Sequence, residues 1–134
     1  MLNIPLKAPP RWILPIVEYA KDLYKVWISV YRNIPRSERI GIGHKIDGLC
    51  LELLELLRKA TYAPVEEKIT LLKRVGETVD ALRFFMQLAW ETSLIHARPY
   101  ATLGEKIECL GRMVGGWSKE LARRNPAHGG ERRG

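Results

Sequence analysis

The sequence predicts an all-α fold, an antiparallel up-down-up-down bundle of four helices. Apolar residues recur at alternating spacings of three and four through most of the 134 residues, which is the period of a helix. Prolines and short polar segments divide this pattern into four stretches of three turns or more. Short connections between such stretches favour antiparallel neighbours. No stretch alternates with the period of two that a half-buried strand requires, so we expect no sheet.

The first helix is expected over residues 12–34, beginning at Trp12 or only at Pro15. Residues 1–11 are expected to form an extended arm, because their three prolines resist helix formation. Pro35 marks the break after the helix. The apolar positions of this helix are Ile16, Ala20, Leu23, Trp27, Val30 and Ile34.

The second helix is expected over residues 37–61, with Ser37 as its N-cap. Its other apolar residues spread beyond one stripe around most of its circumference, so it must be buried on more than one side. Two explanations remain open. The helix is central within one protomer, or it also faces a second subunit through residues such as Leu51 and Leu54. The stripe itself comprises Ile46, Leu49, Leu53, Leu56 and Ala60.

The third and fourth helices are expected to begin at prolines, which suit the first turn of a helix. The third covers residues 64–95, and the fourth begins at Pro99 and ends before Asn125. We therefore predict one bundle domain over residues 12–124 and a flexible basic tail over residues 125–134. The stripes are Leu72, Val75, Val79, Leu82, Met86 and Ala89 in the third helix, and Leu103, Ile107, Leu110, Val114, Trp117 and Leu121 in the fourth.

The predicted fourth helix contains four glycines, Gly104, Gly111, Gly115 and Gly116. Each costs about 1 kcal/mol relative to alanine in a helix interior, so something must offset that cost. Gly111 and Gly115 share one face and leave a shallow groove along it. This groove indicates either a contact with a subunit or partner, or tight packing within one bundle. Early fraying at Gly115 and Gly116 is a further explanation.

The net charge of +7 favours a polyanionic partner, such as nucleic acid or an acidic protein surface. Residues 123–134 contain four arginines and one glutamate, and so carry +3 of that charge. No apolar run approaches the roughly 20 residues that cross a bilayer, and the N-terminus lacks the layout of a secretion signal. We expect a cytoplasmic protein with no membrane partner.

No motif of a known catalytic or nucleotide-binding site is present, so we expect neither enzymatic activity nor a cofactor. Cys50 and Cys109 occur singly within apolar helical stretches. They form no ligand cluster with the three histidines, which predicts buried, inert thiols with neither a disulfide nor a metal site.

Basic residues are the candidate binding groups. Arg36, Arg39 and Lys45 surround the first connection, Arg74 lies on the third helix and Arg112 on the fourth. Several cations on one surface can hold phosphates, and such binding is strongly salt-sensitive. The alternative is a solvated surface with local ion pairs.

Arg83 differs from these residues because it lies beside the core stripe, between Leu82 and Phe84. Its guanidinium therefore needs a partner. Asp80, three residues earlier on the same helix, can supply one. Alternatively, Arg83 faces an anion at an interface or inner channel of an oligomer.

Three segments together resemble the Avd-like family of four-helix bundle proteins. Residues 34–39 and 42–46, IPRSER and IGHKI, resemble its first connection. Residues 82–89, LRFFMQLA, resemble its third helix. Residues 111–117, GRMVGGW, resemble its closing G-R-x-x-G-G-W motif, and the resemblance extends over about residues 16–122.

This resemblance implies a non-catalytic accessory variability determinant of a diversity-generating retroelement. Such proteins form pentameric barrels that associate with a reverse transcriptase and its template RNA and support error-prone cDNA synthesis. The family often carries a second arginine four residues after the position of Arg83, where this chain has Gln87. Related bundles are encoded in intervening sequences of ribosomal RNA genes, and the alternative is a structural oligomer of that type with another protein partner.

With this family in view, two sets of residues are expected to form contacts. The oligomer interface is expected to include Leu51, Leu54, Gly111 and Gly115. The residues expected to bind the partner protein, RNA or DNA are Arg83, Arg36, Arg39, Lys45, Arg74 and Arg112.

Overall fold

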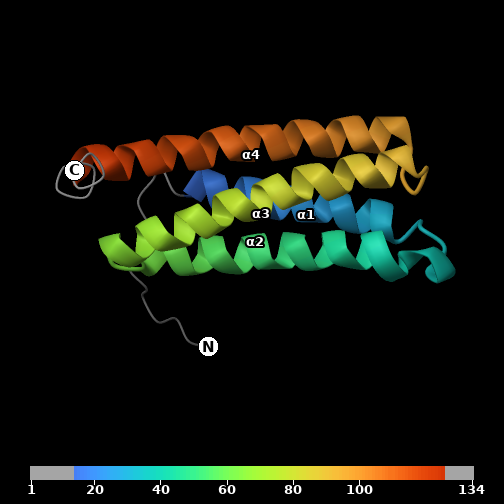
Figure 1. The fold of residues 1–134 in the computed structure, drawn as a ribbon, viewed down its shortest axis with the longest axis horizontal. Coiled ribbons are helices and arrows are strands. Elements are labelled where there is room, and N and C mark those ends of the chain that lie inside the picture. The colour runs from blue at the N-terminus through green and yellow to red at the C-terminus, as the bar shows by residue number, and fades with distance from the viewer. Residues whose placement is uncertain (1–13, 126–134) are drawn as a thin grey trace, which may run out of the picture.

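The computed structural model describes residues 14–125, and within them it contains four long helices and no strand. The helices lie side by side and alternate in direction, so that helices adjacent in sequence are antiparallel (Figure 1). Each helix packs against two others, which closes the bundle around one core. The predicted four-helix fold is confirmed. The helices are α1 (Leu14–Tyr31), α2 (His44–Tyr62), α3 (Val65–Glu91) and α4 (Ala97–Arg124).

The core consists of the predicted stripes, because every stripe residue except the half-buried Val30 is buried. Trp27 and Leu23 of α1 are completely buried, as are several residues on each of the other helices. Burying one large apolar side chain contributes roughly 1.5–3 kcal/mol, so this shared core is the main stabilising feature of the bundle.

The helix ends agree with the sequence prediction in part. Helix α1 ends at Tyr31, before its predicted end at residue 34. Helix α3 begins at Val65, directly after Pro64, close to its predicted start. Helix α4 ends at Arg124, as predicted, and the side-chain amide of Asn125 donates a hydrogen bond of 2.9 Å to the carbonyl of Leu121. The predicted arm over residues 1–11 and the predicted tail beyond Asn125 lie outside the described residues.

The predicted start of the second helix at Ser37 is wrong, because α2 begins at His44. The intervening segment forms a 3₁₀ turn, η1 (Arg36–Glu38), and a wider turn, η2 (Arg39–Gly43). Within η2 the chain leaves helical geometry, and Gly41 has a φ of +92°, which glycine adopts without strain. Ser37 makes no capping hydrogen bond at η1.

Two hydrogen bonds to Asp47, which we call the polar anchor, join α1 to α2 beside the apolar core. The indole Nε1 of Trp27 and the hydroxyl of Tyr24 both donate to Oδ1 of Asp47, over 3.2 and 3.0 Å. Burial, reinforced by this hydrogen bond, raises the pKa of Tyr24 to about 12. One carboxylate of α2 therefore satisfies two donors of α1 and sets the register between the helices.

Two further contacts hold the remaining connections. The ammonium of Lys68 on α3 donates to the carbonyls of Ala63 and Thr61 at the end of α2, over 2.8 and 3.4 Å, and burial lowers its pKa. At the α3–α4 connection, the rings of Trp90 and Tyr100 stack with centroids 5.0 Å apart. The bonds of Lys68 satisfy carbonyls at the end of α2, where unpaired backbone groups are costly.

Replacing Asp47 with alanine is expected to destabilise the bundle by about 1–3 kcal/mol, because two partly buried donors lose their acceptor. Urea unfolding followed by circular dichroism measures the change. Glu52→Ala, at an exposed position on the same helix, is the control and should change stability by less than about 0.5 kcal/mol. Equal effects of the two substitutions would contradict the role of Asp47.

Candidate nucleic-acid and partner interface

Arg39 is engaged by its own chain. Its Nε donates to the carbonyl of Ile34 over 2.8 Å, and its Nη2 donates to the carbonyl of Arg32 over 3.1 Å. The guanidinium also lies 5.7 Å from the ring centroid of Tyr31, a cation–π arrangement. Arg39 therefore braces the end of α1 against η2, and part of its hydrogen-bonding capacity is already used.

Arg36 and Lys45 leave their charges more available. Arg36 is exposed in η1 and forms no ion pair with any described residue. Lys45 is exposed on the first turn of α2, and its ammonium lies 5.7 Å from the ring centroid of Phe85 on α3. The structure thus brings Arg36, Arg39 and Lys45 to one end of the bundle, around the first connection.

Arg83 forms two ion pairs on the seam between α3 and α4. Its Nη1 lies 2.6 Å from Asp80, and its Nε lies 2.5 Å from Glu108 of α4. The hydrogen bonds that Arg83 donates to Glu108 are the main cause that raises the pKa of Arg83, and the same bonds lower the pKa of Glu108. The predicted pairing with Asp80 is therefore present, and the three side chains together carry a net negative charge.

Arg112 shares a hollow of about 310 Å³ with Arg83 on this same seam. Arg74 lies earlier on α3 and is exposed without an ion pair among the described residues. The six predicted binding residues consequently fall into three places, namely the first connection, the α3–α4 seam and the first half of α3. The structure does not unite them in one patch.

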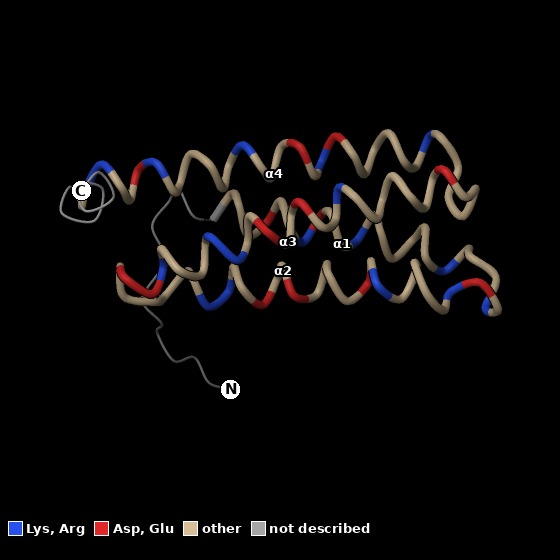
Figure 2. Tube along the Cα trace, viewed as in Figure 1, with Lys and Arg blue, Asp and Glu red and all other residues tan. Residues whose placement is uncertain are grey.

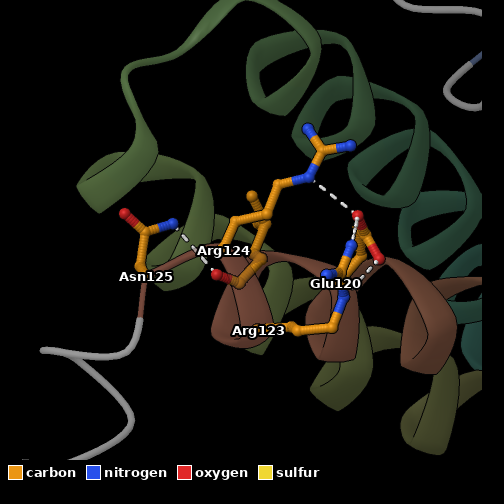
Figure 3. Close-up of polar contacts among 5 residues, drawn as sticks. Glu120, Arg123, Arg124 and Asn125 are labelled. Atoms are coloured by element: carbon orange, nitrogen blue, oxygen red, sulfur yellow. Dashed lines mark hydrogen bonds and ion pairs between the residues drawn. The ribbon is translucent and has the colours of Figure 1, made fainter.

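At the C-terminal end of α4, two arginines of the basic segment 123–134 form ion pairs with a carboxylate of the same helix. Glu120 accepts hydrogen bonds from Arg123 and Arg124, each with a closest distance of 2.7 Å, as the close-up in Figure 3 shows. The bond from Arg123 is the main cause that lowers the pKa of Glu120. Cations in the last turn also favour the helix dipole, so these two arginines have a local structural role.

Charges of both signs alternate along all four helices (Figure 2). Salt bridges neutralise six of the described cations, but a set that we call the free cations forms neither an ion pair nor a cation–π contact within residues 14–125. These residues are exposed, and no carboxylate must be displaced before they meet an anion. The free cations are Lys25, Arg32, Arg36, Lys73, Arg74, Arg98, Arg112 and Lys119.

Exposed large apolar side chains occur on one half of the bundle. They belong to η2, α2 and α3, and none belongs to residues 15–31 of α1 or to α4. The wide apolar surface of α2 is mostly used inside the protomer, since Cys50 and Leu57 are buried and Leu54 packs against the core. Leu51 remains 47 % exposed. The full set is Ile40, Leu51, Tyr62, Val65, Phe84 and Trp90.

The glycines of α4 separate into two kinds. A Cβ at Gly111 would lie 3.4 Å from Nη2 of Arg83 and 3.7 Å from Val79, so this position packs closely within the protomer. A Cβ at Gly104, Gly115 or Gly116 would meet nothing within 4 Å. Packing inside the protomer therefore accounts for Gly111 alone, and the helix-propensity cost at the other three is not offset there.

The described residues hold no group of three or more side chains suited to binding a metal ion. Cys50 is buried, and burial raises the pKa of its thiol to about 12. Cys109 is half-buried, less enclosed than the sequence predicted. None of the helices in the described part of the chain has the length and hydropathy to cross a membrane.

Sequence reasoning missed the exposed residues Ile40, Phe84 and Trp90. All three are large apolar residues at positions outside the apolar stripes, and this position in the sequence is the signal that could have predicted their exposure. Ile40 also stands between a charged residue and a glycine, where no core position is expected. Exposure itself depends on the path of the η2 turn and on the stacking at the α3–α4 end, which a stripe pattern does not describe.

A comparison with protein families matches residues 14–121 to the model described as bAvd-like. The match covers most of the chain and includes part of every helix. The chain belongs to the bAvd-like family. This confirms the resemblance drawn from its three sequence segments, and it assigns the chain to a family of accessory, non-catalytic proteins. No curated protein matches the chain.

Two glycines of this bAvd-like chain should respond to alanine in opposite directions. Gly115→Ala is expected to raise the free energy of unfolding by up to about 1 kcal/mol, because the new Cβ meets no atom of the protomer. Gly41→Ala is expected to lower it by about 1–3 kcal/mol, because of the positive φ. Urea unfolding at one protein concentration measures both. A loss of stability in Gly115→Ala would mean that another molecule occupies that space.

Proposed function

We propose that this chain is an accessory variability determinant of a diversity-generating retroelement. It assembles into a homo-oligomer, the pentameric ring that the resemblance implies, and binds the reverse transcriptase and its template RNA. It thereby supports mutagenic cDNA synthesis, while the polymerase supplies the chemistry. The observation that carries this proposal is the bAvd-like match over residues 14–121.

The free cations support the nucleic-acid part of the proposal. A cation without a carboxylate partner can replace the counterions of a phosphate directly, and the release of those counterions drives binding. Arg36 and Arg74 are both exposed and belong to the predicted binding set. Arg83 contributes less as a cation, because Asp80 and Glu108 already neutralise it.

The asymmetry between the two halves of the bundle supports self-association. Apart from Ile40 in η2, the exposed apolar side chains lie on α2 and α3, whereas α4 offers positions such as Gly115 with open space around them. Large side chains such as Leu51 can fit against such a surface on a second copy. A contact between two different faces is head-to-tail, and it closes into a ring when the rotation permits.

The oligomer is tested by the mass in solution. The wild-type chain is expected to have the mass of a pentamer in light scattering after gel filtration. Leu51→Asp is expected to shift it toward the monomer, because a carboxylate replaces an exposed leucine in the contact. His44 is exposed at the first position of α2, and His44→Asp is the control that should leave the mass unchanged. A wild-type monomer would remove the ring from the proposal.

RNA binding is tested by fluorescence anisotropy with a labelled single-stranded template RNA over a series of salt concentrations. The double variant Arg36→Gln, Arg74→Gln is expected to bind about tenfold more weakly at low salt. Its dependence of log K on log salt should also be shallower, by roughly 0.7 for each lost phosphate contact. Arg58→Gln is the control, because Arg58 is already paired with Glu55 over 2.7 Å.

Two outcomes would contradict the proposed function. One is an oligomer that ignores RNA at low salt and does not bind a reverse transcriptase. The other is a gene located in an intervening sequence of a ribosomal RNA gene, with no reverse transcriptase gene nearby. Either outcome would favour a structural oligomer with another protein partner.

A further inference from the structure

Ile40 is the most exposed of the large apolar side chains in the described part of the chain, with 82 % of its surface accessible. It lies in η2, in the connection between α1 and α2 at one end of the bundle. Neither the core nor the polar anchor at Asp47 involves it. A polar residue would connect the two helices equally well, so the isoleucine needs another explanation.

The turn that presents Ile40 is held on both sides. On one side, Arg39 donates to the carbonyls of Ile34 and Arg32, and Ile34 itself is buried. On the other side, Gly43 is buried against Tyr31, where a Cβ would lie only 3.1 Å from the ring. A preorganised turn loses little conformational freedom when it binds, which is a property of recognition elements.

The sequence on both sides of the isoleucine is predominantly positive. Between residues 32 and 45 there are four cations and a single carboxylate, that of Glu38. Two of these cations, Arg32 and Arg36, form no ion pair with any described residue. An apolar side chain flanked by available arginines complements an apolar socket bordered by carboxylates.

We propose that Ile40 is a docking knob that inserts into an apolar socket on a protein partner, with carboxylates of that partner facing Arg36 and Arg32. The inference rests on the proposed function, in which this partner is the reverse transcriptase. A protein fits better than RNA, because the aliphatic side chain of Ile40 cannot hydrogen-bond or stack on bases and gains only from apolar contact.

The test is capture of the reverse transcriptase of a diversity-generating retroelement by the full-length chain, measured as an affinity at one low and one moderate salt concentration. Ile40→Asp is expected to weaken capture about tenfold or more, whereas Ile40→Leu should retain it. Thr70→Asp, at an exposed β-branched residue on α3, is the matched control and should bind like the wild type. Arg36→Glu should weaken capture as well, and more strongly at low salt.

Folding is not expected to interfere, because Ile40 makes no core contact, and circular dichroism and solution mass of Ile40→Asp should equal those of the wild type. Capture of the enzyme with equal affinity by the wild type and Ile40→Asp would overturn this inference alone. If Ile40→Asp instead dissociates the oligomer, the molecule that contacts Ile40 is a second copy of this chain. If the substitution weakens only RNA binding, the molecule that contacts Ile40 is RNA. Both results overturn the proposal. Failure of the wild type to capture the enzyme would refute the reverse-transcriptase part of the proposed function together with it.

Discussion

The simultaneous burial of four apolar stripes is the constraint on which the rest of this structure depends. Once the stripes of α1, α2, α3 and α4 face one core, the position of every other helical residue relative to that core follows from the helical period. Leu51 and Phe84 are exposed for this reason, and so are Arg74 and Arg112. The exposed surface of the protein is therefore the complement of its core, and a change in helix register would alter both.

Charge pairing then decides which cations can act on a partner. The count of 22 basic residues overstates the available positive surface, because Asp80, Glu108 and Glu120 each engage an arginine. Arg83 shows the consequence most clearly. Its two carboxylates make it a link between α3 and α4 and limit its use as a site for phosphate. The exposed cations that lack such partners are the ones expected to produce salt-sensitive binding.

The first connection shows how far sequence reasoning reached. Pro35 correctly predicts a break after the first helix, although α1 already ends at Tyr31, and the pattern predicts the start of the second helix at Ser37 instead of His44. Local propensity favoured Ser37 as a cap. The packing of Gly43 against Tyr31, together with the hydrogen bonds of Arg39 to the end of α1, favours a turn instead. These contacts join residues on two elements, so no local pattern contains them.

The sequence by itself determined the helical class, the stripe residues and the family, because these depend on periodicity and on short motifs that survive without coordinates. It also identified Asp80 as a partner for Arg83, since a spacing of three brings two side chains together on any helix. Only the tertiary structure decided that Glu108 completes that ion pair, that Gly111 packs within the protomer while Gly115 does not, and that Ile40 points outward. Each of these depends on the relative positions of separate elements, which core packing sets.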